Sequence, residues 1–395
     1  MIDAPNPAGP GNDRPAAVRQ RVVFNGRFLA QVHTGVQRYA AETLLALDAL
    51  LAARPELSAG WQFELAVPDA ARALPLTCIR RVHVPGPGGH LWEQWPLLRH
   101  SHGAFLVNFN YSGPLLKRRQ LITIHDATVR AMPQAFSRAY RWVHNAMVSV
   151  LGRSADSVMT VSEFSRDELR RWFGLRREDI VVGREGGEHA ARPADDAAVL
   201  RQHGLESGRF ILGVGSVKPN KNFDLVGRAM RLLPGYPVPV AIAGAKDIGI
   251  FRDASARADG FRFLGFVSDD DLSALYRHAA WFVLPSLYEG FGLPAVEAMA
   301  NGCPVLAARA ASIPEVCGDA ALYFDPQDPA SLADVLQRVA QHPELRGRLV
   351  AAGRERLTRY HWRANAQILL DHLAHKLLVQ PHIAERPALH RIEPR

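Results

Sequence analysis

The sequence predicts an α/β protein that consists of two Rossmann-like, doubly wound domains. Strand-like and helix-like segments alternate in both halves of the chain, which is the pattern of parallel sheets covered by helices on both faces. At 395 residues the chain is long enough for two domains of ordinary size, each with its own core. A polar stretch rich in Gly, Ala and Pro separates the two series, and we expect the interdomain linker at residues 191–208.

The first domain is expected over residues 21–190. Its apolar segments are short, and a polar turn or a helix follows each of them. We expect strands at residues 21–26, 61–67, 104–110, 120–126 and 157–163, and a helix at residues 36–51. Residues 1–20 lack the apolar core of a signal peptide, so we expect a disordered leader there.

The second domain is expected over residues 209–360. We expect its strands at residues 210–215, 238–244, 261–266, 281–286 and 303–308, and a closing helix that starts at Pro329. Residues 361–378 predict one more helix, and residues 379–395 predict a loose tail.

Composition predicts a globular protein in a reducing compartment. The chain is 48% hydrophobic and 22% charged, as in soluble domains. Its three cysteines, Cys78, Cys303 and Cys317, are too few and too scattered for a disulfide framework or a metal knuckle. No uninterrupted apolar run approaches the length of a transmembrane helix. We therefore expect a cytoplasmic protein.

The net charge of +8 is concentrated in the first part of the chain. Residues 1–150 hold 16 Arg and Lys but only nine Asp and Glu. A basic surface of this kind suits an anionic membrane or a phosphate-bearing substrate, and its alternative is a merely solvated surface. No zinc-finger spacing, RNP-like strand or basic heptad region is present, so nucleic acid is not an expected partner.

Residues 284–305, LPSLYEGFGLPAVEAMANGCPV, are the most informative stretch of the chain. Glu289 and Glu297 are eight residues apart, a little over two helical turns, so both carboxylates are expected on one side. Gly290 and Gly292 allow the backbone to approach a ligand, and Pro294 suits a first helical turn. The alternative is a strand–turn–helix corner whose glutamates are only solvated.

This stretch resembles the signature of retaining glycosyltransferases of the GT-B fold, family 4. The likeness continues through residues 307–336, 265–279 and 211–226, and it covers most of residues 208–375. It implies two Rossmann-like domains that face a cleft, with a nucleotide sugar bound to the second domain and the acceptor to the first. It also implies that the helix at residues 361–378 crosses back onto the first domain.

The resemblance assigns roles to the signature residues. Glu289 is expected to contact hydroxyls of the transferred sugar and to stabilise an oxocarbenium-like centre, and Glu297 is expected to bind the ribose. Donor binding is also expected from a group of residues in the glycine-containing loops: Gly35, Gly215, Ser216, Lys218, Phe291, Gly292 and Leu293.

The loop GVGSVKPNKN, residues 213–222, is expected to bind the diphosphate. Negative charge develops there as the diphosphate departs, so cations and N–H donors are needed. Lys221 matches the family lysine, but Ser216 and Asn220 occupy the places where the family has an arginine. Lys218 is expected to supply the missing charge. The alternative is that both lysines are solvated turn residues.

In the first domain, His125 and Asp126 follow a predicted strand, and the resemblance implies that His125 reaches the donor sugar through its imidazole or its backbone. The alternative is a structural histidine at a strand end. Gly35 is expected to let a helix N-terminus face the diphosphate or the acceptor, with Arg38 adding charge. In residues 160–169, Ser162 is expected to cap a helix, with Ser165 as the alternative.

Two patterns are discounted. Asp269 and Asp271 form an Asp-x-Asp pattern that binds a metal–diphosphate complex in another glycosyltransferase fold, but here they precede a helix. Capping and the helix dipole explain them better. The segment GVGSVK lacks the third glycine of a dinucleotide fingerprint. We therefore expect no metal site and no cofactor.

The segments FNGRFLAQVHTGVQRYA and GSVKPNKN are similar to those of bacterial mannosyl- or rhamnosyltransferases of surface polysaccharide assembly. The resemblance implies a retaining, metal-independent hexosyltransferase, with GDP-mannose as the favoured donor and a polysaccharide or lipid-diphosphate-linked glycan as the acceptor. Two alternatives stay open, a nucleotide-sugar 2-epimerase and a non-catalytic partner in polysaccharide assembly. Incubation with the donor alone separates the epimerase from the transferase.

Three clusters of basic and aromatic residues predict peripheral attachment to the inner face of a membrane. They are residues 117–119, residues 138–142 and residues 170–177.

Overall fold

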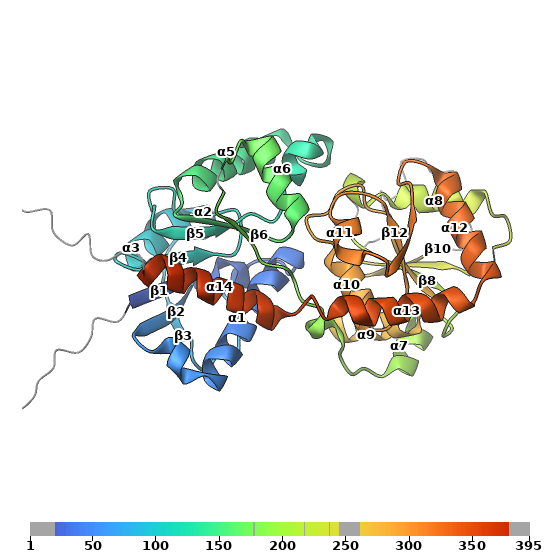
Figure 1. The fold of residues 1–395 in the computed structure, drawn as a ribbon, viewed down its shortest axis with the longest axis horizontal. Helices are drawn as coiled ribbons and strands as arrows, with labels where there is room; N and C mark the ends of the chain where they lie inside the picture. Colours follow the sequence, from blue (N-terminus) through green and yellow to red (C-terminus); the bar gives the residue numbers. More distant parts are fainter. Residues whose placement is uncertain (1–19, 177, 217, 237, 245–260, 379–395) are drawn as a thin grey trace, which may run out of the picture.

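The computed structural model describes residues 20–176, 178–216, 218–236, 238–244 and 261–378. The predicted tail, and the predicted leader up to residue 19, lie outside these residues. Two domains lie side by side and are joined by two stretches of chain, one near residue 185 and one just before the last helix (Figure 1).

The first domain is built on a sheet with the strand order β3-β2-β1-β4-β5-β6-β7. Every pairing recorded among its described residues is parallel. Its strands are β1 (Gln20–Asn25), β2 (Trp61–Val67), β3 (Arg80–His83), β4 (Phe105–Asn108), β5 (Gln120–Thr123), β6 (Ser157–Thr160) and β7 (Ile180–Val182). The order reverses between β1 and β4, as in a doubly wound sheet.

The second domain repeats this plan in the order β10-β9-β8-β11-β12-β13. Its strands are β8 (Ile211–Val214), β9 (Val240–Ala243), β10 (Phe261–Gly265), β11 (Trp281–Leu284), β12 (Val305–Ala308) and β13 (Ala321–Phe324). The pairings recorded here are also parallel. The predicted α/β class with two Rossmann-like domains is therefore confirmed.

Helices cover both sheets. In the first domain these are α1 (Gly35–Ala53), α2 (His90–Trp92), α3 (Leu98–His100), α4 (Thr128–Ala131), α5 (Arg138–Ser154) and α6 (Glu163–Phe173), with a π-helical turn η3 (Glu93–Leu97) between α2 and α3. The second domain carries α7 (Asp196–His203), α8 (Phe223–Arg231), α9 (Asp269–His278), α10 (Leu293–Ala300), α11 (Ile313–Cys317), α12 (Pro329–Gln341) and α13 (Glu344–Leu357). The last helix is α14 (Trp362–Leu378).

The sequence did not predict β3, β7 or β13, which are short strands at sheet edges. β3 has the sequence RRVH and is mostly exposed, so it lacks the apolar run that predicts a strand. β13 has only a partly buried pattern. Edge strands are commonly short and charged, which limits pairing with other chains.

Helix α14 packs along α1 of the first domain, although it follows the second domain in the sequence (Figure 1). Its apolar side chains Leu369, Leu370 and Leu373 are buried in the same cluster as Leu44 and Leu47 of α1. The first domain's core is thus completed by the end of the chain.

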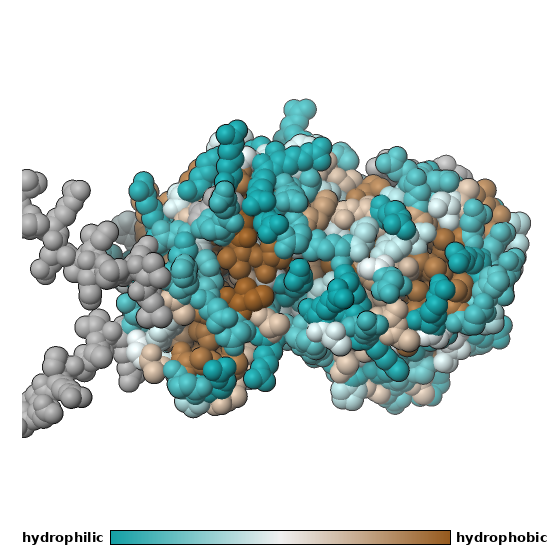
Figure 2. All heavy atoms as spheres, in the orientation of Figure 1, coloured by the Kyte–Doolittle hydropathy of each residue, from teal (hydrophilic) through white to brown (hydrophobic). Residues whose placement is uncertain are grey.

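Most of the visible surface is hydrophilic, and apolar side chains gather in patches on both domains (Figure 2). The predicted basic cluster at residues 117–119 needs a correction. Lys117 is buried and donates to the carbonyl of Ser101 (2.8 Å), and burial lowers its pKa to about 8. No described helix combines the length and apolar character needed to cross a bilayer.

Candidate active site

The predicted site residues of the second domain lie in the loops that follow β8 and β11. These strands are neighbours in the sheet and run parallel, so their carboxyl ends meet at one edge. In open α/β sheets ligands bind at this edge. The loop after β11 carries the Glu289 motif, and the loop after β8 ends in the short 3₁₀ turn η6 (Pro219–Lys221).

A lysine–glutamate pair joins these two loops. Lys221 Nζ lies 2.6 Å from Glu289 Oε1, and the Ser286 hydroxyl donates to the same oxygen at 2.6 Å. Both charged side chains are largely buried. The Asn220 amide also donates to the carbonyl of Tyr288 (3.3 Å), which ties the lysine loop to the glutamate loop. The second domain therefore holds a cation and a carboxylate in direct contact.

The turn that carries Glu289 ends at Gly292, whose φ of 97° lies in the left-handed region. Helix α10 begins at the next residue, with Pro294 in its first turn as predicted. Glu289 thus precedes the helix by four positions, and the two-turn helical spacing proposed for the two glutamates is wrong. The charges of both carboxylates nevertheless act on one buried residue, Glu185, and raise its pKa.

The tip of the same turn meets the first domain. A Cβ added to Gly290 would lie 2.7 Å from the carbonyl oxygen of His125 and 3.0 Å from Cβ of Asp126. The Gly290 carbonyl accepts hydrogen bonds from Ser162 (2.5 Å) and Ser165 (2.9 Å) of the first domain. Glycine is therefore required here because the backbones of the two domains approach each other closely.

Ser162 has two functions in this contact. Its hydroxyl oxygen accepts the N–H of Ser165 at 2.9 Å and so caps α6, as predicted. A second cap comes from the other domain, because Glu315 of α11 accepts the N–H groups of Glu163 (3.0 Å) and Phe164 (2.9 Å). A carboxylate at a helix N-terminus is favoured by the dipole and the free N–H groups.

Glu297 lies deeper in α10 and is held by internal partners. Its carboxylate accepts from Tyr276 (3.1 Å) and contacts His189 Nε2 at 3.0 Å. The Trp362 indole donates to Nδ1 of the same histidine (3.0 Å). His189 belongs to the first stretch of chain that joins the domains, and Trp362 follows the second stretch and starts α14. Glu297 is therefore bonded directly to the first stretch, and through His189 to the start of α14.

His125 follows β5 and is packed between the domains. Its Nε2 lies 3.0 Å from the carbonyl oxygen of Phe109, and its ring contacts Tyr39 edge-on at 4.8 Å. Burial lowers the pKa of His125, although the hydrogen bond to Phe109 opposes this. A carbonyl only accepts, so Nε2 carries the proton and Nδ1 is the acceptor of the neutral ring.

The remaining predicted donor-binding residues differ in their placement. Ser216 and Lys218 are exposed, and Lys218 Nζ lies 5.5 Å from the ring of Phe136 in the first domain. Gly215 packs beside Lys221, with 3.4 Å between the position of an added Cβ and Lys221 Cγ. Gly35 begins α1, and no protein atom lies within 4 Å of an added Cβ there.

The side chains of Phe291 and Leu293 are buried with Tyr360 and Trp362 in the apolar cluster of the first domain. The Phe291 ring meets Tyr360 edge-on at 5.4 Å. The backbone of these two residues is therefore the part left for contact with a ligand, together with Gly292.

The capping prediction for Asp269 and Asp271 is wrong in detail. Ser268 is the N-cap of α9 and accepts the N–H of Asp271 at 3.1 Å. Asp269 instead pairs with Arg38 of α1 at 2.5 Å, across the two domains. The acidic first turn does complement the helix dipole. Among the described residues, no group of three or more His, Cys, Asp and Glu is arranged to hold a metal ion.

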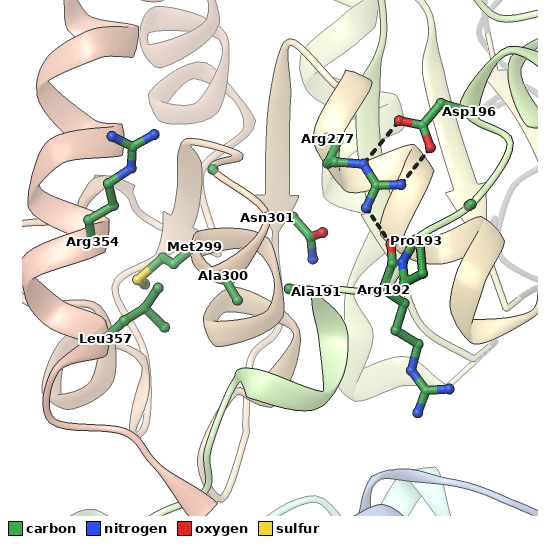
Figure 3. A pocket seen from close by; sticks show the side chains of 12 residues that line it. Ala191, Arg192, Pro193, Asp196, Arg277, Met299, Ala300, Asn301, Arg354 and Leu357 are labelled. Carbon is green, nitrogen blue, oxygen red and sulfur yellow. Dashed lines mark hydrogen bonds and ion pairs between the residues drawn. The ribbon is translucent and has the colours of Figure 1, made fainter.

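A cavity of about 570 Å³ lies elsewhere, between α7, α9, α10 and α13 of the second domain (Figure 3). Arg277 is engaged there by Asp196 in a bidentate pair, and the Arg192 and Arg354 side chains point away from each other (Figure 3). No signature residue that was predicted to bind the donor lines it. Its position does not match the predicted donor site.

Sequence reasoning missed several residues of the site. Glu185, Ser286, His189 and Tyr276 were not predicted, although each contacts a predicted residue or acts on its charge. The segment GREGGEH, residues 183–189, directly follows β7. Its polar residues at a strand end were the available signal for Glu185 and His189.

Two doubly wound sheets with charged loops at their facing edges define the GT-B class of folds. Sucrose-phosphate synthase from Thermosynechococcus elongatus has this architecture and superposes with a TM-score of 0.70 at 20% identity, covering 91% of this chain and 100% of that one. The predicted GT-B fold is confirmed.

Family models identify the chain more closely. The model of Glycosyltransferase Family 4 matches residues 33–186, and the model of Glycosyl transferases group 1 matches residues 196–356. O-antigen chain mannosyltransferase B of Escherichia coli is 32% identical over 265 residues, which cover 64% of this chain and 69% of that protein. Mannosylfructose-phosphate synthase of Agrobacterium fabrum is 30% identical over 278 residues, 64% of this chain and 60% of that protein. The chain belongs to glycosyltransferase family 4 and is a glycosyltransferase.

Proposed function

We propose that the chain is a retaining, metal-independent mannosyltransferase. It transfers a mannosyl group from GDP-mannose to a polysaccharide or to a lipid-diphosphate-linked glycan. The sugar is supported by the relative named an O-antigen chain mannosyltransferase, and the transfer site by the pair of Lys221 and Glu289. That pair is the observation that carries the proposal.

The pair matches the charges that appear during transfer. The bond between the sugar C1 and the phosphate oxygen breaks, which leaves negative charge on the diphosphate and positive charge on the sugar ring. An ammonium and a carboxylate 2.6 Å apart stabilise these two charges respectively. When the diphosphate binds, Lys221 turns from Glu289 to the phosphate, and the carboxylate is released toward the sugar.

Retention of configuration follows if the acceptor attacks from the face that the phosphate leaves. The acceptor oxygen forms the new bond to C1, and its proton passes to an oxygen of the departing phosphate. No enzyme nucleophile is needed in this path. His125 and its carbonyl lie against Gly290, beside the glutamate, and close the site from the first domain.

The direct test is a product assay with purified protein, a panel of nucleotide sugars and a lipid-diphosphate oligosaccharide acceptor. We expect transfer of mannose from GDP-mannose, an α-linked product by NMR, and unchanged rates in EDTA. A β-linked product would exclude retention. Conversion of the donor in the absence of acceptor would show the 2-epimerase instead, and failure with every donor would support the non-catalytic partner.

The same proposal includes attachment to an anionic membrane through the first domain. Trp142 of α5 is 75% exposed and Leu116 is 86% exposed. The loop that carries Leu116 contacts α5 through the Tyr111 and His144 rings, 4.3 Å apart. Exposed Arg138 lies at the start of the same helix. Aromatic side chains flanked by basic ones suit a membrane interface.

We expect the protein to sediment with vesicles that contain anionic lipid at low salt and to be released as salt rises. Trp142→Ala should weaken this binding, whereas Trp172→Ala should not, because Trp172 is partly covered and engaged by Glu168 (2.7 Å). Equal binding to neutral vesicles would contradict an electrostatic attraction to anionic lipid.

A further inference from the structure

Glu185 is a buried acid that no part of the transfer chemistry above uses. It follows β7 in the interdomain connection and is 6% exposed. Its Oε1 lies 4.0 Å from Nδ1 of His125. Among the described residues, no lysine or arginine forms an ion pair with it.

The groups around Glu185 come from several elements and are mostly acidic. His125 and Asp126 face it from the loop after β5, and Tyr39 from α1. Glu289 and Glu297 act on it from the second domain. Lys221, the cation of the site, is already paired with Glu289. A negative charge on Glu185 would therefore be opposed from both domains.

The hydrogen bond from Nε2 of His125 leaves the other ring nitrogen, Nδ1, for an interaction with Glu185. Because Nε2 donates to the Phe109 carbonyl (3.0 Å), Nδ1 carries a lone pair, and this nitrogen lies 4.0 Å from Oε1 of Glu185. A carboxylate facing this lone pair could only repel it. A neutral carboxylic acid, in contrast, has an O–H that can donate to Nδ1 after a shift of about 1 Å to the usual bond length.

We propose that Glu185 is a positioning residue of the transfer site that acts as a neutral acid and donates to Nδ1 of His125. It fixes the ring in the tautomer whose Nε2 donates to Phe109, and so fixes the backbone carbonyl of His125 against Gly290. The inference rests on the proposed transfer function only for its effect on rates. A neutral donor also adds no negative charge to a site that must accept a diphosphate.

The surroundings that set the pKa of Glu185 agree with this geometry. Burial raises the pKa of the Glu185 carboxyl well above its ordinary value of 4.5, and the charges of Glu297, Glu289 and Asp126 raise it further. A raised pKa of an acid makes folding less favourable as pH rises above 4.5, because the unfolded chain ionises while the folded one keeps its proton. Replacing Glu185 by a neutral isostere removes this loss.

The first test is the stability of Glu185→Gln across pH. We expect its melting temperature to exceed that of the wild type by an amount that grows between pH 5 and pH 8. Glu64→Gln is the matched control, since Glu64 is also buried, but bonds from Arg80 and Arg21 outweigh burial and lower its pKa. That variant should be less stable than the wild type at pH 8. If the Glu185→Gln variant became less stable than the wild type as pH rises, the proposal would be overturned.

The second test reads the histidine itself. In protein labelled with ¹⁵N-histidine, with the His125 signals assigned by their loss in His125→Gln, we expect a neutral ring with the proton on Nε2 in the wild type and in Glu185→Gln. Glu185→Ala should mix the tautomers. A doubly protonated ring in the wild type would show an ion pair and overturn the proposal.

The kinetic readout separates this inference from the proposed function. Glu185→Gln should keep the wild-type turnover within about threefold, and Glu185→Ala should lose about tenfold, as for one lost hydrogen bond. Equal losses in both variants would mean that the carboxylate is the active form and would overturn the proposal. If the panel gave no transfer at all, the stability and NMR results would still decide the state of Glu185.

Discussion

The two domains contribute to the site in different ways. The second domain brings a cation and a carboxylate within 2.6 Å of each other on two loops of one sheet edge. The first domain brings His125, and the connection that follows its last strand brings Glu185; their polar groups face each other and buried backbone rather than a cation. The charged groups that contact each other are thus in the second domain, whereas the first-domain side contributes groups that position the backbone. Substitutions in the second domain should act mainly on turnover, and those in the first on orientation.

The largest effect is expected for Lys221→Ala. Losing one preorganised cation at the leaving diphosphate costs about 2–4 kcal/mol of transition-state stabilisation, or about 30- to 1,000-fold in kcat/KM. Steady-state kinetics with GDP-mannose measure this. Lys376→Ala is the control, because that lysine lies on α14 and pairs with Asp179 at 3.4 Å. A Lys221→Ala variant with wild-type turnover would remove the phosphate assignment.

Glu289→Gln should reduce kcat by about a hundredfold and leave donor affinity nearly unchanged. In the proposed role the carboxylate stabilises charge that grows only in the transition state, whereas the amide keeps the shape and much of the hydrogen bonding. Rates at saturating donor, together with a binding isotherm for GDP, separate the two quantities. A large loss of donor affinity with intact kcat would mean that Glu289 and Glu297 have exchanged roles.

Glu297→Gln should mainly raise the KM for the donor, by about tenfold, because ribose contacts change little between ground and transition states. It should also lower the melting temperature, since the carboxylate joins Tyr276 of α9 to His189 of the connection. Kinetics and calorimetry measured on the same sample report both effects. A fall in kcat with unchanged KM would place Glu297 at the reacting centre.

Lys218→Ala should have the smallest effect, no more than about fivefold in kcat/KM. Its ammonium is exposed and lies 5.5 Å from the Phe136 ring, an interaction worth about 0.5–1 kcal/mol at such a site. If the loss equals that of Lys221→Ala, Lys218 supplies the charge that the family arginine supplies elsewhere. The second domain would then supply two cations from one loop, and its contrast with the first domain would be larger.

The fold was predictable from the sequence because its central strands are apolar and buried on both faces. β4, β8 and β11 fall within the predicted segments, and β1 begins one residue before its own, whereas the edge strand β3 is short and charged and gave no signal. Ser162 was predicted as a cap because capping is a local property of a few residues. Local sequence patterns therefore predicted the central strands and the helix cap.

The site was predictable only where its residues are close in the sequence. Glu289 and Lys221 lie in contiguous motifs, but their contact joins residues 68 positions apart. The spacing argument was wrong because it applied helical periodicity to all eight residues, whereas the helix begins only at Leu293. Glu185 and His189 lie in a polar segment after a strand, but their contacts with His125 and Glu297 depend on how the two domains meet, which no local pattern encodes.

The position of α14 has a consequence for biosynthesis. The first domain's sheet is complete at β7, yet the helix that covers α1 starts roughly 180 residues later. At ribosomal speeds of 5–20 residues per second, on the order of ten to forty seconds pass between the completion of this sheet and the synthesis of the helix that covers α1. During that time the nascent chain must form an entire second domain beside an unfinished one. A ribosome that stalls within α13 should therefore leave the first domain open to chaperones, even though every strand of its sheet has been made.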